Sequence, residues 1–378
     1  MSGLAAPESG PAPQTILTVR GLGVRLSTSH GMVHAVNGVN LELARGQTHA
    51  LVGESGSGKS VTALAITGLL PKRRVVVTGQ ILLDGTDLTA LAEREMRRIR
   101  GRDIGMIFQD PSAALNPVRR VGGQVAEALT AQGMDRAQAR RHAQGLLGEV
   151  GLANPSRLAR RYPFELSGGM KQRVVIAAAM ASRPKVLIAD EPTTALDATI
   201  QEQVLRLLHQ MTVDTGTAML LITHDLAVAA RAATRVSVMY GGTIVETGET
   251  AAILRRPRHP YTVALLGAIP HLRREAGPLR GVGGDPLDPR SVPAACPFAP
   301  RCNWAVADCW SQRPALEPAG LDDTEPALSR HLVACWNQVR PAEIALGMPD
   351  RPDFQRADAS ALPSGRVTPR TPRKADTP

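Results

Sequence analysis

Short apolar runs alternate with amphipathic stretches through the first 270 residues of the chain. The apolar runs fit buried strands, and the stretches between them repeat apolar positions with the period of a helix. The expected strands lie at 16–19, 33–43, 48–52, 104–108, 186–189, 219–223, 236–240 and 242–246. The expected helices lie at 60–70, 88–100, 121–152 with a break near Gly133, and 169–182. Strands and helices in this order predict an α/β protein with a largely parallel sheet.

The composition changes after Pro270. Residues 271–295 are rich in Gly, Pro and Arg, which is typical of a linker, and all four cysteines follow. Beyond about residue 348, Pro, Arg, Asp, Ser and Thr dominate, which favours disorder. We therefore predict a disordered lead at 1–15, a main domain at 16–270, a small cysteine-containing C-terminal extension at 271–340 and a disordered tail at 341–378.

Charge and hydropathy narrow the classes of function. The net charge of +10 would suit a nucleic acid or an anionic surface. The arginines are scattered, however, so no specific nucleic-acid partner is expected. No apolar run approaches the ~20 residues that a membrane-spanning helix needs, and the N-terminus lacks the pattern of a secretory signal. The chain is expected to be cytosolic, or attached to a membrane through a partner.

A glycine-rich segment lies between the predicted strand at 48–52 and the predicted helix at 60–70. It reads Gly-Glu-Ser-Gly-Ser-Gly-Lys-Ser, the pattern of a phosphate-binding loop. Its backbone N–H groups and the following helix N-terminus suit an anion. Lys59 is expected to reach the β- and γ-phosphates of ATP, and the Ser60 hydroxyl to ligate Mg²⁺. The expected ATP-contacting residues here are Gly53, Glu54, Ser55, Gly56, Ser57, Gly58, Lys59 and Ser60.

Two adjacent acidic residues follow the predicted strand at 186–189. Asp190 emerges at the carboxyl end of a buried strand, where it can hold Mg²⁺ directly or through water. Glu191 lies one residue further on, so it can face the attacking water as a general base. Together with the phosphate-binding loop, this pair predicts an enzyme that hydrolyses ATP.

A third motif makes a family resemblance specific. Residues 166–170 read Leu-Ser-Gly-Gly-Met and resemble the signature motif of the ABC ATPases. The resemblance implies a P-loop NTPase with a RecA-like core, an antiparallel β subdomain and an α-helical subdomain. It also implies that Ser167, Gly168 and Gly169 contact the γ-phosphate of ATP held by a second subunit. Two chains would then enclose two ATP molecules.

Three further segments fit the motif order of that family. Gln109 resembles the Q-loop glutamine, which contacts Mg²⁺ or water and senses the membrane partner. His224 resembles the switch histidine that reaches the γ-phosphate. Residues 195–197, Ala-Leu-Asp, resemble the D-loop at the subunit interface. The resemblance therefore implies Glu191, His224 and Gln109 as catalytic residues.

One position departs from the family pattern. ABC ATPases usually stack adenine on an aromatic residue upstream of the phosphate-binding loop, but no Phe, Tyr or Trp precedes Phe108 here. Residues 24–26, Val-Arg-Leu, occupy the approximate place. An aliphatic side chain, His30 or His34 is the remaining candidate for packing against adenine.

Three stretches, at 108–117, 162–170 and 258–266, resemble the dipeptide, oligopeptide and nickel importer subfamily. This implies an ATP-hydrolysing subunit that powers an importer, with di- or oligopeptides as the expected solute. The implied partners are a second, homologous ABC ATPase subunit, two membrane-spanning permease subunits and an external solute-binding protein. The chain would lie peripherally at the cytoplasmic face of the cell membrane. The alternative is a soluble ABC ATPase acting on DNA or ribosomes, which usually carries two ATPase units or a long coiled-coil insertion.

The cysteines have a spacing of their own. Cys296, Cys302, Cys309 and Cys335 do not form the closely spaced pairs of zinc fingers. Four thiolates on one short segment suit an iron–sulfur cluster. Importer-subfamily members that resemble this chain in the cysteine pattern are associated with a 4Fe–4S cluster. Zinc and free thiols stay open as alternatives.

Overall fold

The computed structural model describes residues 14–194, 196–268, 282–290, 294–320 and 331–340. The predicted tail at 341–378 and residues 1–13 of the predicted lead lie outside this range, as does much of the predicted linker. Residue 15, assigned to the lead, already belongs to the first strand.

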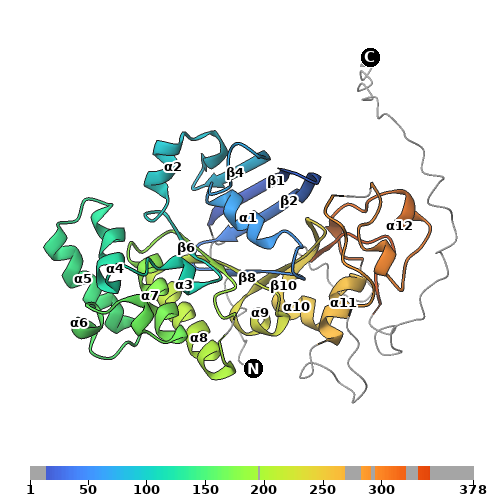
Figure 1. Cartoon of the computed structure of the whole chain (residues 1–378). Helices are drawn as coiled ribbons and strands as arrows, with labels where there is room; N and C mark the ends of the chain where they lie inside the picture. The colour runs from blue at the N-terminus through green and yellow to red at the C-terminus, as the bar shows by residue number, and fades with distance from the viewer. Residues whose placement is uncertain (1–13, 195, 269–281, 291–293, 321–330, 341–378) are drawn as a thin grey trace, which may run out of the picture.

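Within the described residues, a mixed sheet of eight strands forms the centre of the molecule (Figure 1). Its strand order is β11-β12-β10-β9-β3-β8-β7-β6. The neighbouring strands β9, β3, β8, β7 and β6 run parallel to one another. The strands β10, β12 and β11 pair antiparallel with their neighbours. The bounds are β3 Thr48–Val52, β6 Ile104–Ile107, β7 Val186–Asp190, β8 Ala218–Thr223, β9 Arg235–Tyr240, β10 Thr243–Glu249, β11 Glu317–Pro318 and β12 Leu332–Val333. The parallel sheet and the hairpin of β9 and β10 confirm the sequence prediction.

Every residue of β3, β7 and β8 is buried, which explains why these strands read as continuous apolar runs. Successive side chains serve opposite faces of the sheet. Along β7, Val186 and Ile188 join one hydrophobic core, and Leu187 and Ala189 join another. The central strands therefore have apolar layers on both sides.

The first layer is an antiparallel sheet in the order β2-β1-β4-β5. Helix α1 packs beneath this sheet, above the central one (Figure 1). The bounds are β1 Thr15–Thr28, β2 Gly31–Ala44, α1 Lys59–Ile66, β4 Val75–Leu83, β5 Thr86–Asp87, the 3-10 turn Leu88–Ala90 and α2 Glu93–Ile99. The predicted strands at 16–19 and 33–43 are therefore parts of longer strands, and β4 was not predicted.

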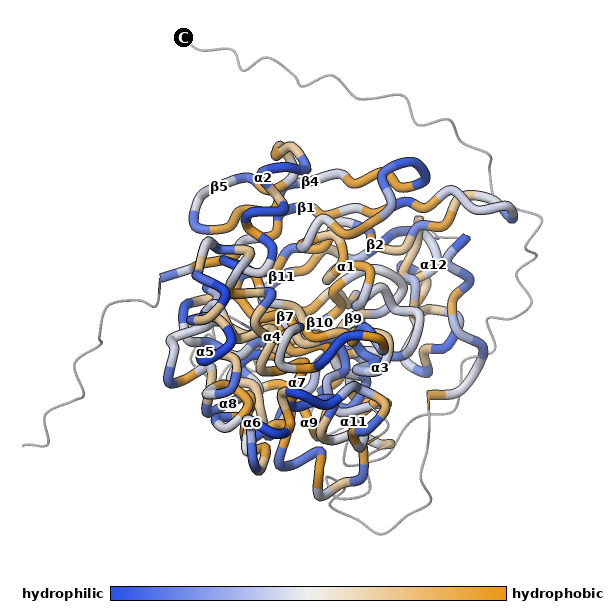
Figure 2. Tube along the Cα trace, turned by 60° about the vertical axis from the view of Figure 1, so that its left-hand side comes forward, coloured by the Kyte–Doolittle hydropathy of each residue, from blue (hydrophilic) through white to orange (hydrophobic). Residues whose placement is uncertain are grey.

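The second layer is a group of helices at the left of Figure 1. The bounds are α3 Pro111–Ala114, α4 Val121–Thr130, α5 Arg136–Glu149, α6 Pro155–Leu158, α7 Gly168–Met180 and α8 Ala198–Thr215. The predicted break near Gly133 is confirmed, because Gly133 lies between α4 and α5 with φ +92°. Hydrophobic and hydrophilic residues alternate along the traces of these helices (Figure 2). The hydrophobic residues Val125, Leu147 and Ile176 are buried in one core.

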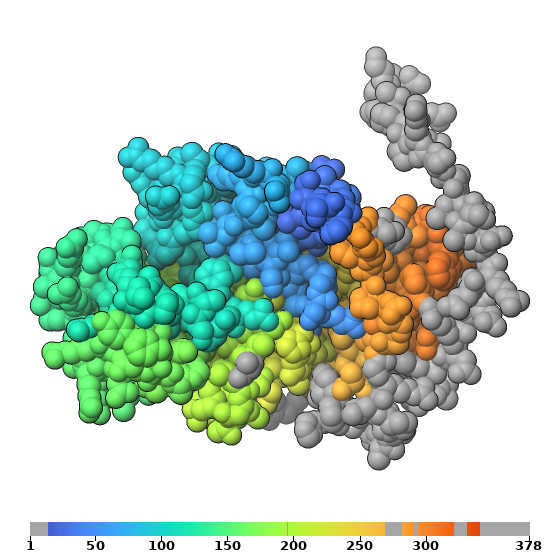
Figure 3. Space-filling view, in the orientation of Figure 1, coloured from blue at the N-terminus to red at the C-terminus, as the bar shows by residue number. Residues whose placement is uncertain are grey.

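The C-terminal extension packs on the opposite end of the sheet, where it forms the orange surface in Figure 3. Its strand β12 pairs with β10. Phe298 of the extension shares a third hydrophobic core with Tyr240 and Tyr261 of the main domain. The bounds in this region are α9 Leu226–Ala232, α10 Thr250–Arg255, α11 Pro260–Gly267, the 3-10 turn Ala299–Arg301 and α12 Asp308–Ser311. Among the helices of the described residues, none combines the length and the hydropathy needed to cross a membrane.

Candidate functional site

The phosphate-binding loop joins the carboxyl end of β3 to α1, as predicted. Lys59 is the first residue of α1 and is buried. Its Nζ donates hydrogen bonds to the carbonyl oxygens of Gly53 and Glu54, both at 2.8 Å, and to Ser57 Oγ at 3.4 Å. Burial lowers the pKa of Lys59, although nearby carboxylates oppose that shift. The loop therefore holds a partly desolvated cation at its centre.

Two glycines of the loop allow it to pack against neighbouring strands. A Cβ atom at Gly53 would lie 2.1 Å from the Met239 carbonyl oxygen. A Cβ atom at Gly58 would lie 2.4 Å from the Ala35 carbonyl oxygen, and Gly58 has φ +106°. Only glycine fits such close approaches and such a backbone. β9 and β2 therefore fix the shape of the loop.

The two predicted magnesium ligands are in direct contact. Ser60 Oγ donates a hydrogen bond of 3.0 Å to Asp190 Oδ1. Burial raises the pKa of Asp190, and the charge of Glu191 adds to that rise, while the Ser60 hydrogen bond opposes it. A hydroxyl and a carboxylate oxygen are hard donors of the kind that Mg²⁺ prefers. These residues therefore fit a magnesium ion.

Glu191 is the point at which the predicted catalytic residues meet. Its Oε2 accepts hydrogen bonds from Gln109 Nε2 at 3.1 Å and from Thr194 Oγ1 at 2.8 Å. Its Oε1 lies 3.3 Å from His224 Nδ1. Burial alone would raise the pKa of Glu191, but hydrogen bonds from Thr194 and His224 lower it overall. The side chain is thus an oriented carboxylate, which can accept a proton from water.

The signature residues lie at the N-terminus of α7. The Ser167 side chain caps the helix and accepts a hydrogen bond from the Met170 N–H at 3.4 Å. Ser167 and Gly168 are exposed. A Cβ atom at Gly168 would lie 4.0 Å from Leu196 of the predicted D-loop, whose residue 195 is outside the described residues. This end of α7 is therefore accessible to another molecule.

The solvent exposure of the residues expected to pack against adenine excludes one of them. Val24 is fully buried in the core, so it has no face to offer a base. Leu26 and His34 are half-buried, and His30 is exposed. The aliphatic candidate in this segment is therefore Leu26.

Some contacts of the site were not anticipated from the sequence. Thr194 fixes Glu191, and nothing in the motif order pointed to it. The Tyr261 ring is fully buried in the core, and its hydroxyl accepts a hydrogen bond of 2.8 Å from the Glu54 N–H. Arg301 contacts the side chain of Glu54. Tyr261 lies in the stretch at 258–266 that resembles the importer subfamily, whereas no motif pointed to Arg301.

The four cysteines lie close enough to influence one another. Cys296, Cys302 and Cys309 are buried, and Cys335 is half-buried. Burial raises the pKa of all four thiols, to about 12 for Cys302, and charge on the other three adds to the rise at Cys335. Within the described ranges, no group of three or more His, Cys, Asp or Glu side chains is arranged to hold a metal ion. The iron–sulfur, zinc and free-thiol hypotheses therefore stay predictions.

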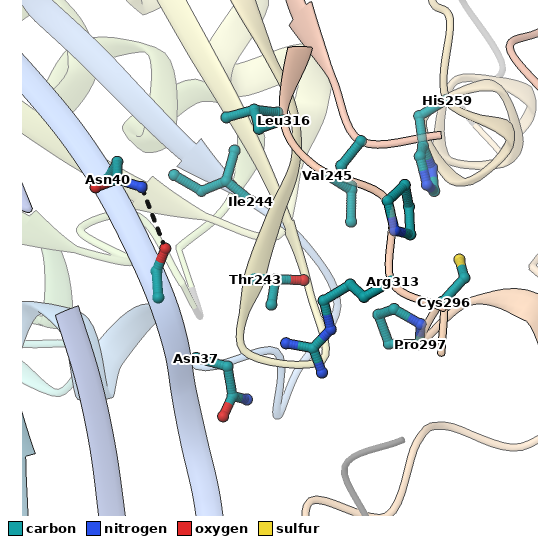
Figure 4. Close-up of a pocket in the computed structure, with 13 residues that line it drawn as sticks. Asn37, Asn40, Thr243, Ile244, Val245, His259, Cys296, Pro297, Arg313 and Leu316 are labelled. Carbon is teal, nitrogen blue, oxygen red and sulfur yellow. Dashed lines mark hydrogen bonds between the residues drawn. The ribbon is translucent and has the colours of Figure 1, made fainter. Parts of the chain in front are cut away.

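Two hollows lie beside the site. A groove of about 450 Å³ runs between the central sheet and the helical layer and is lined by Leu69, Phe108, Leu115 and Ala128 among others. A smaller cavity of about 160 Å³ lies at the seam between the extension and strands β2 and β10. Figure 4 shows Cys296 on one side of this cavity and Asn37 on the other.

Comparisons with known proteins agree with an ATP-binding site in this chain. The family model described as ABC transporter matches residues 36–194, and the model described as oligopeptide/dipeptide transporter, C-terminal region, matches residues 245–309. The dipeptide transport ATP-binding protein DppD of Bacillus subtilis is 44% identical over 342 residues, covering 90% of this chain and 100% of that protein. The chain belongs to the ATP-binding proteins of ABC transporters.

Further relatives of this ABC ATPase agree with that assignment. The oligopeptide transport ATP-binding protein OppD of Bacillus subtilis is 46% identical over 304 residues, covering 80% of this chain and 85% of OppD. The dimeric ATP-binding cassette MJ0796, solved in a post-hydrolysis state with ADP and Pi, superposes with a TM-score of 0.56 at 28% identity. That match covers 62% of this chain and 99% of the cassette. The protein has the ABC ATPase fold that the sequence predicted.

Proposed function

We propose that this ABC ATPase hydrolyses ATP to power an importer for di- or oligopeptides. The observation that carries the proposal is the meeting of Gln109, Thr194 and His224 at the Glu191 carboxylate. This cluster lies one residue from the contact between Asp190 and Ser60. The peptide substrate is supported by the match of residues 245–309 to the C-terminal region of oligopeptide and dipeptide transporters. It is also supported by the similarity to DppD and OppD.

The chain's own side chains account for the steps of hydrolysis. Lys59 binds the β- and γ-phosphates, whose oxygens replace the loop oxygens that it contacts now. Ser60 and Asp190 would hold Mg²⁺, which would neutralise charge on the phosphates. Glu191 accepts a proton from the attacking water, and Gln109 and His224 orient the reacting groups.

A second ATPase subunit completes the site in this proposal. Ser167 and Gly168 are exposed at a helix N-terminus, which suits the γ-phosphate of a nucleotide held by another chain. The dimeric form of the cassette MJ0796 supports this arrangement. We propose a homologous chain as the partner. The proposed main domain spans 16–270, and the extension spans 271–340.

The groove beside Gln109 is the proposed contact with the permease. Phe108 is 40% exposed and Leu69 is 42% exposed in its lining, and a partly exposed apolar groove suits a short amphipathic helix. Two permease subunits would hold the ATPase dimer peripherally at the cytoplasmic face of the membrane. An external binding protein would deliver the peptide.

Purification of the complex from gently solubilised membranes tests the importer. We expect the protein to be recovered with two multi-span membrane proteins and a second ATPase, identified by mass spectrometry. Leu69→Asp should reduce that recovery several-fold, because a charge would enter the apolar groove. Val213→Asp is the matched control, since Val213 is 57% exposed on α8, away from the groove. Recovery only with ribosomes or DNA-bound proteins would refute the importer and leave the ATP site standing.

For the extension, we propose the 4Fe–4S cluster as the hypothesis to test against zinc and free thiols. Its support is that all four cysteines of the chain lie in this one segment and that three of them are buried. The described side chains are not arranged to hold a metal ion, so the proposed hydrolysis contains no step at the cysteines. Anaerobically purified protein should be brown and should contain iron and sulfide. Replacing any of Cys296, Cys302, Cys309 or Cys335 with Ser should bleach it. A colourless, iron-free wild type would refute the cluster hypothesis. Stoichiometric zinc in that protein would support the zinc hypothesis instead.

A further inference from the structure

Arg301 connects the cysteine-bearing extension directly to the phosphate-binding loop. Its side chain is only 5% exposed, and it lies between Cys296 and Cys302 in the sequence. Its two terminal nitrogens donate to the two carboxylate oxygens of Glu54, at 2.7 and 3.1 Å. Such a forked pair is geometrically specific as well as strong. The contact bridges 247 positions of the chain.

The rest of the Arg301 guanidinium is also held in place. Its Nε donates to the Gly283 carbonyl oxygen at 2.8 Å, and one terminal nitrogen donates to the Val282 carbonyl oxygen at 2.9 Å. The group also lies 5.7 Å from the centre of the Tyr240 ring. An arginine guanidinium stays charged throughout the physiological pH range. The cation is therefore permanent, and its hydrogen bonds hold it rigidly in place.

Glu54 is restrained at each of its polar groups. Its N–H donates to the Tyr261 hydroxyl at 2.8 Å, its carbonyl oxygen accepts from Lys59 Nζ at 2.8 Å, and its carboxylate binds Arg301. Tyr261 and Arg301 both follow β10 in the sequence. Tyr261 packs against the Phe298 ring, and Arg301 lies over the Tyr240 ring. The second residue of the loop is thus held by the C-terminal part of the chain.

The charge of Glu54 explains why such a partner matters. Glu54 is the second residue of the loop, and its carbonyl oxygen accepts a hydrogen bond from Lys59 Nζ at 2.8 Å, so its charged side chain lies close to the place where phosphates would bind. An unpaired carboxylate there would repel the phosphates of ATP. Because the Glu54 side chain is only 28% exposed, water screens that repulsion poorly. Arg301 cancels the charge while it fixes the loop.

We propose that Arg301 is a positioning residue of the ATP site, which acts through Glu54 to set the affinity for ATP. Through Arg301, the extension then contributes to the nucleotide site. This inference rests on the proposed ATPase function. Arg301 itself touches neither the phosphates nor the attacking water, so its loss should raise KM and largely spare kcat.

Binding of the fluorescent analogue mant-ATP with Mg²⁺ to the full-length chain tests this role. Arg301→Gln should weaken binding about tenfold, equivalent to about 1.4 kcal/mol. Adding Glu54→Gln to that variant should restore most of the affinity, because the unpaired charge is removed. Arg290→Gln is the matched control, since Arg290 forms an exposed ion pair with Asp288 in the same extension. It should bind like the wild type.

Other results of these binding measurements would refute the role of Arg301. Unchanged binding by folded Arg301→Gln would overturn the inference. Equal weakness in the double variant would also overturn it, because a merely structural arginine is not rescued by changing Glu54. If Arg301→Gln does not fold, Arg301→Lys replaces it. Lysine keeps the charge but cannot form the fork, so a loss smaller than tenfold is expected, and wild-type affinity would refute the positioning role. A wild type that does not bind the nucleotide would refute the proposed ATPase instead.

Discussion

Replacing Glu191 with Gln should leave ATP bound and nearly stop its hydrolysis. The amide has the shape of the carboxylate, and its oxygen can accept the hydrogen bonds of Gln109 and Thr194. It cannot take a proton from water. A positioned general base contributes about 10²–10⁴-fold to a rate, so turnover should fall by that range. Because the phosphate contacts of Lys59 remain, ATP should stay enclosed between two ATPase chains as a stable dimer.

Turnover assays and the mass of the ATP-bound particle by light scattering check this expectation. The particle should be a dimer of Glu191→Gln chains, or of this chain with its partner ATPase. Glu149→Gln changes an exposed carboxylate on α5 in the same chemical way and should leave both measurements unchanged. Retained turnover without a trapped dimer would count against Glu191 as the base. The pKa of Glu191 lies below its ordinary value, so the wild-type carboxylate is charged at neutral pH, where the two proteins are compared.

The core of the site could be predicted because its motifs are local. The loop from Gly53 to Ser60 and the acids after β7 are each placed by a strand that precedes them, and the carboxyl ends of parallel strands meet at one sheet edge. The contact between Ser60 and Asp190 follows from that arrangement. Gln109 and His224 follow strands β6 and β8 of the same sheet, so they reach Glu191 for the same reason.

The contacts that escaped prediction join segments far apart in the sequence. Arg301 and Tyr261 reach the loop from the C-terminal region, and no local pattern links either of them to Glu54. Strand β4 was missed because most of its residues are exposed or half-buried, so its apolar run lacks the alternation of a half-buried strand. Whether the cysteines bind a cofactor also depends on how the chain brings them together, which spacing alone does not fix.

Replacing Lys59 with Ala should abolish ATP binding at this site, and hydrolysis with it. Lys59 is the buried cation at the centre of the loop, and in the proposed mechanism its ammonium binds the β- and γ-phosphates. The helix N-terminus remains in the variant, but a dipole end alone contributes only about 0.3–1 kcal/mol at exposed positions. Turnover should fall to background, and ATP should no longer raise the melting temperature.

The melting temperature separates this effect from misfolding. In the wild type, ATP at about 100 times its Kd should add about 2.7 kcal/mol to the free energy of unfolding, whereas Lys59→Ala should show no shift. The nucleotide-free variant should remain folded, because burial already disfavours the charged form of Lys59. Lys72→Ala is the control, since the Lys72 side chain is 70% exposed outside the loop, and it should keep the full shift. Normal turnover in Lys59→Ala would overturn the phosphate-binding loop. A partial loss of ATP binding in Arg301→Gln and a complete loss in Lys59→Ala would distinguish the two proposed roles. Arg301 would position the loop, and Lys59 would bind the phosphates.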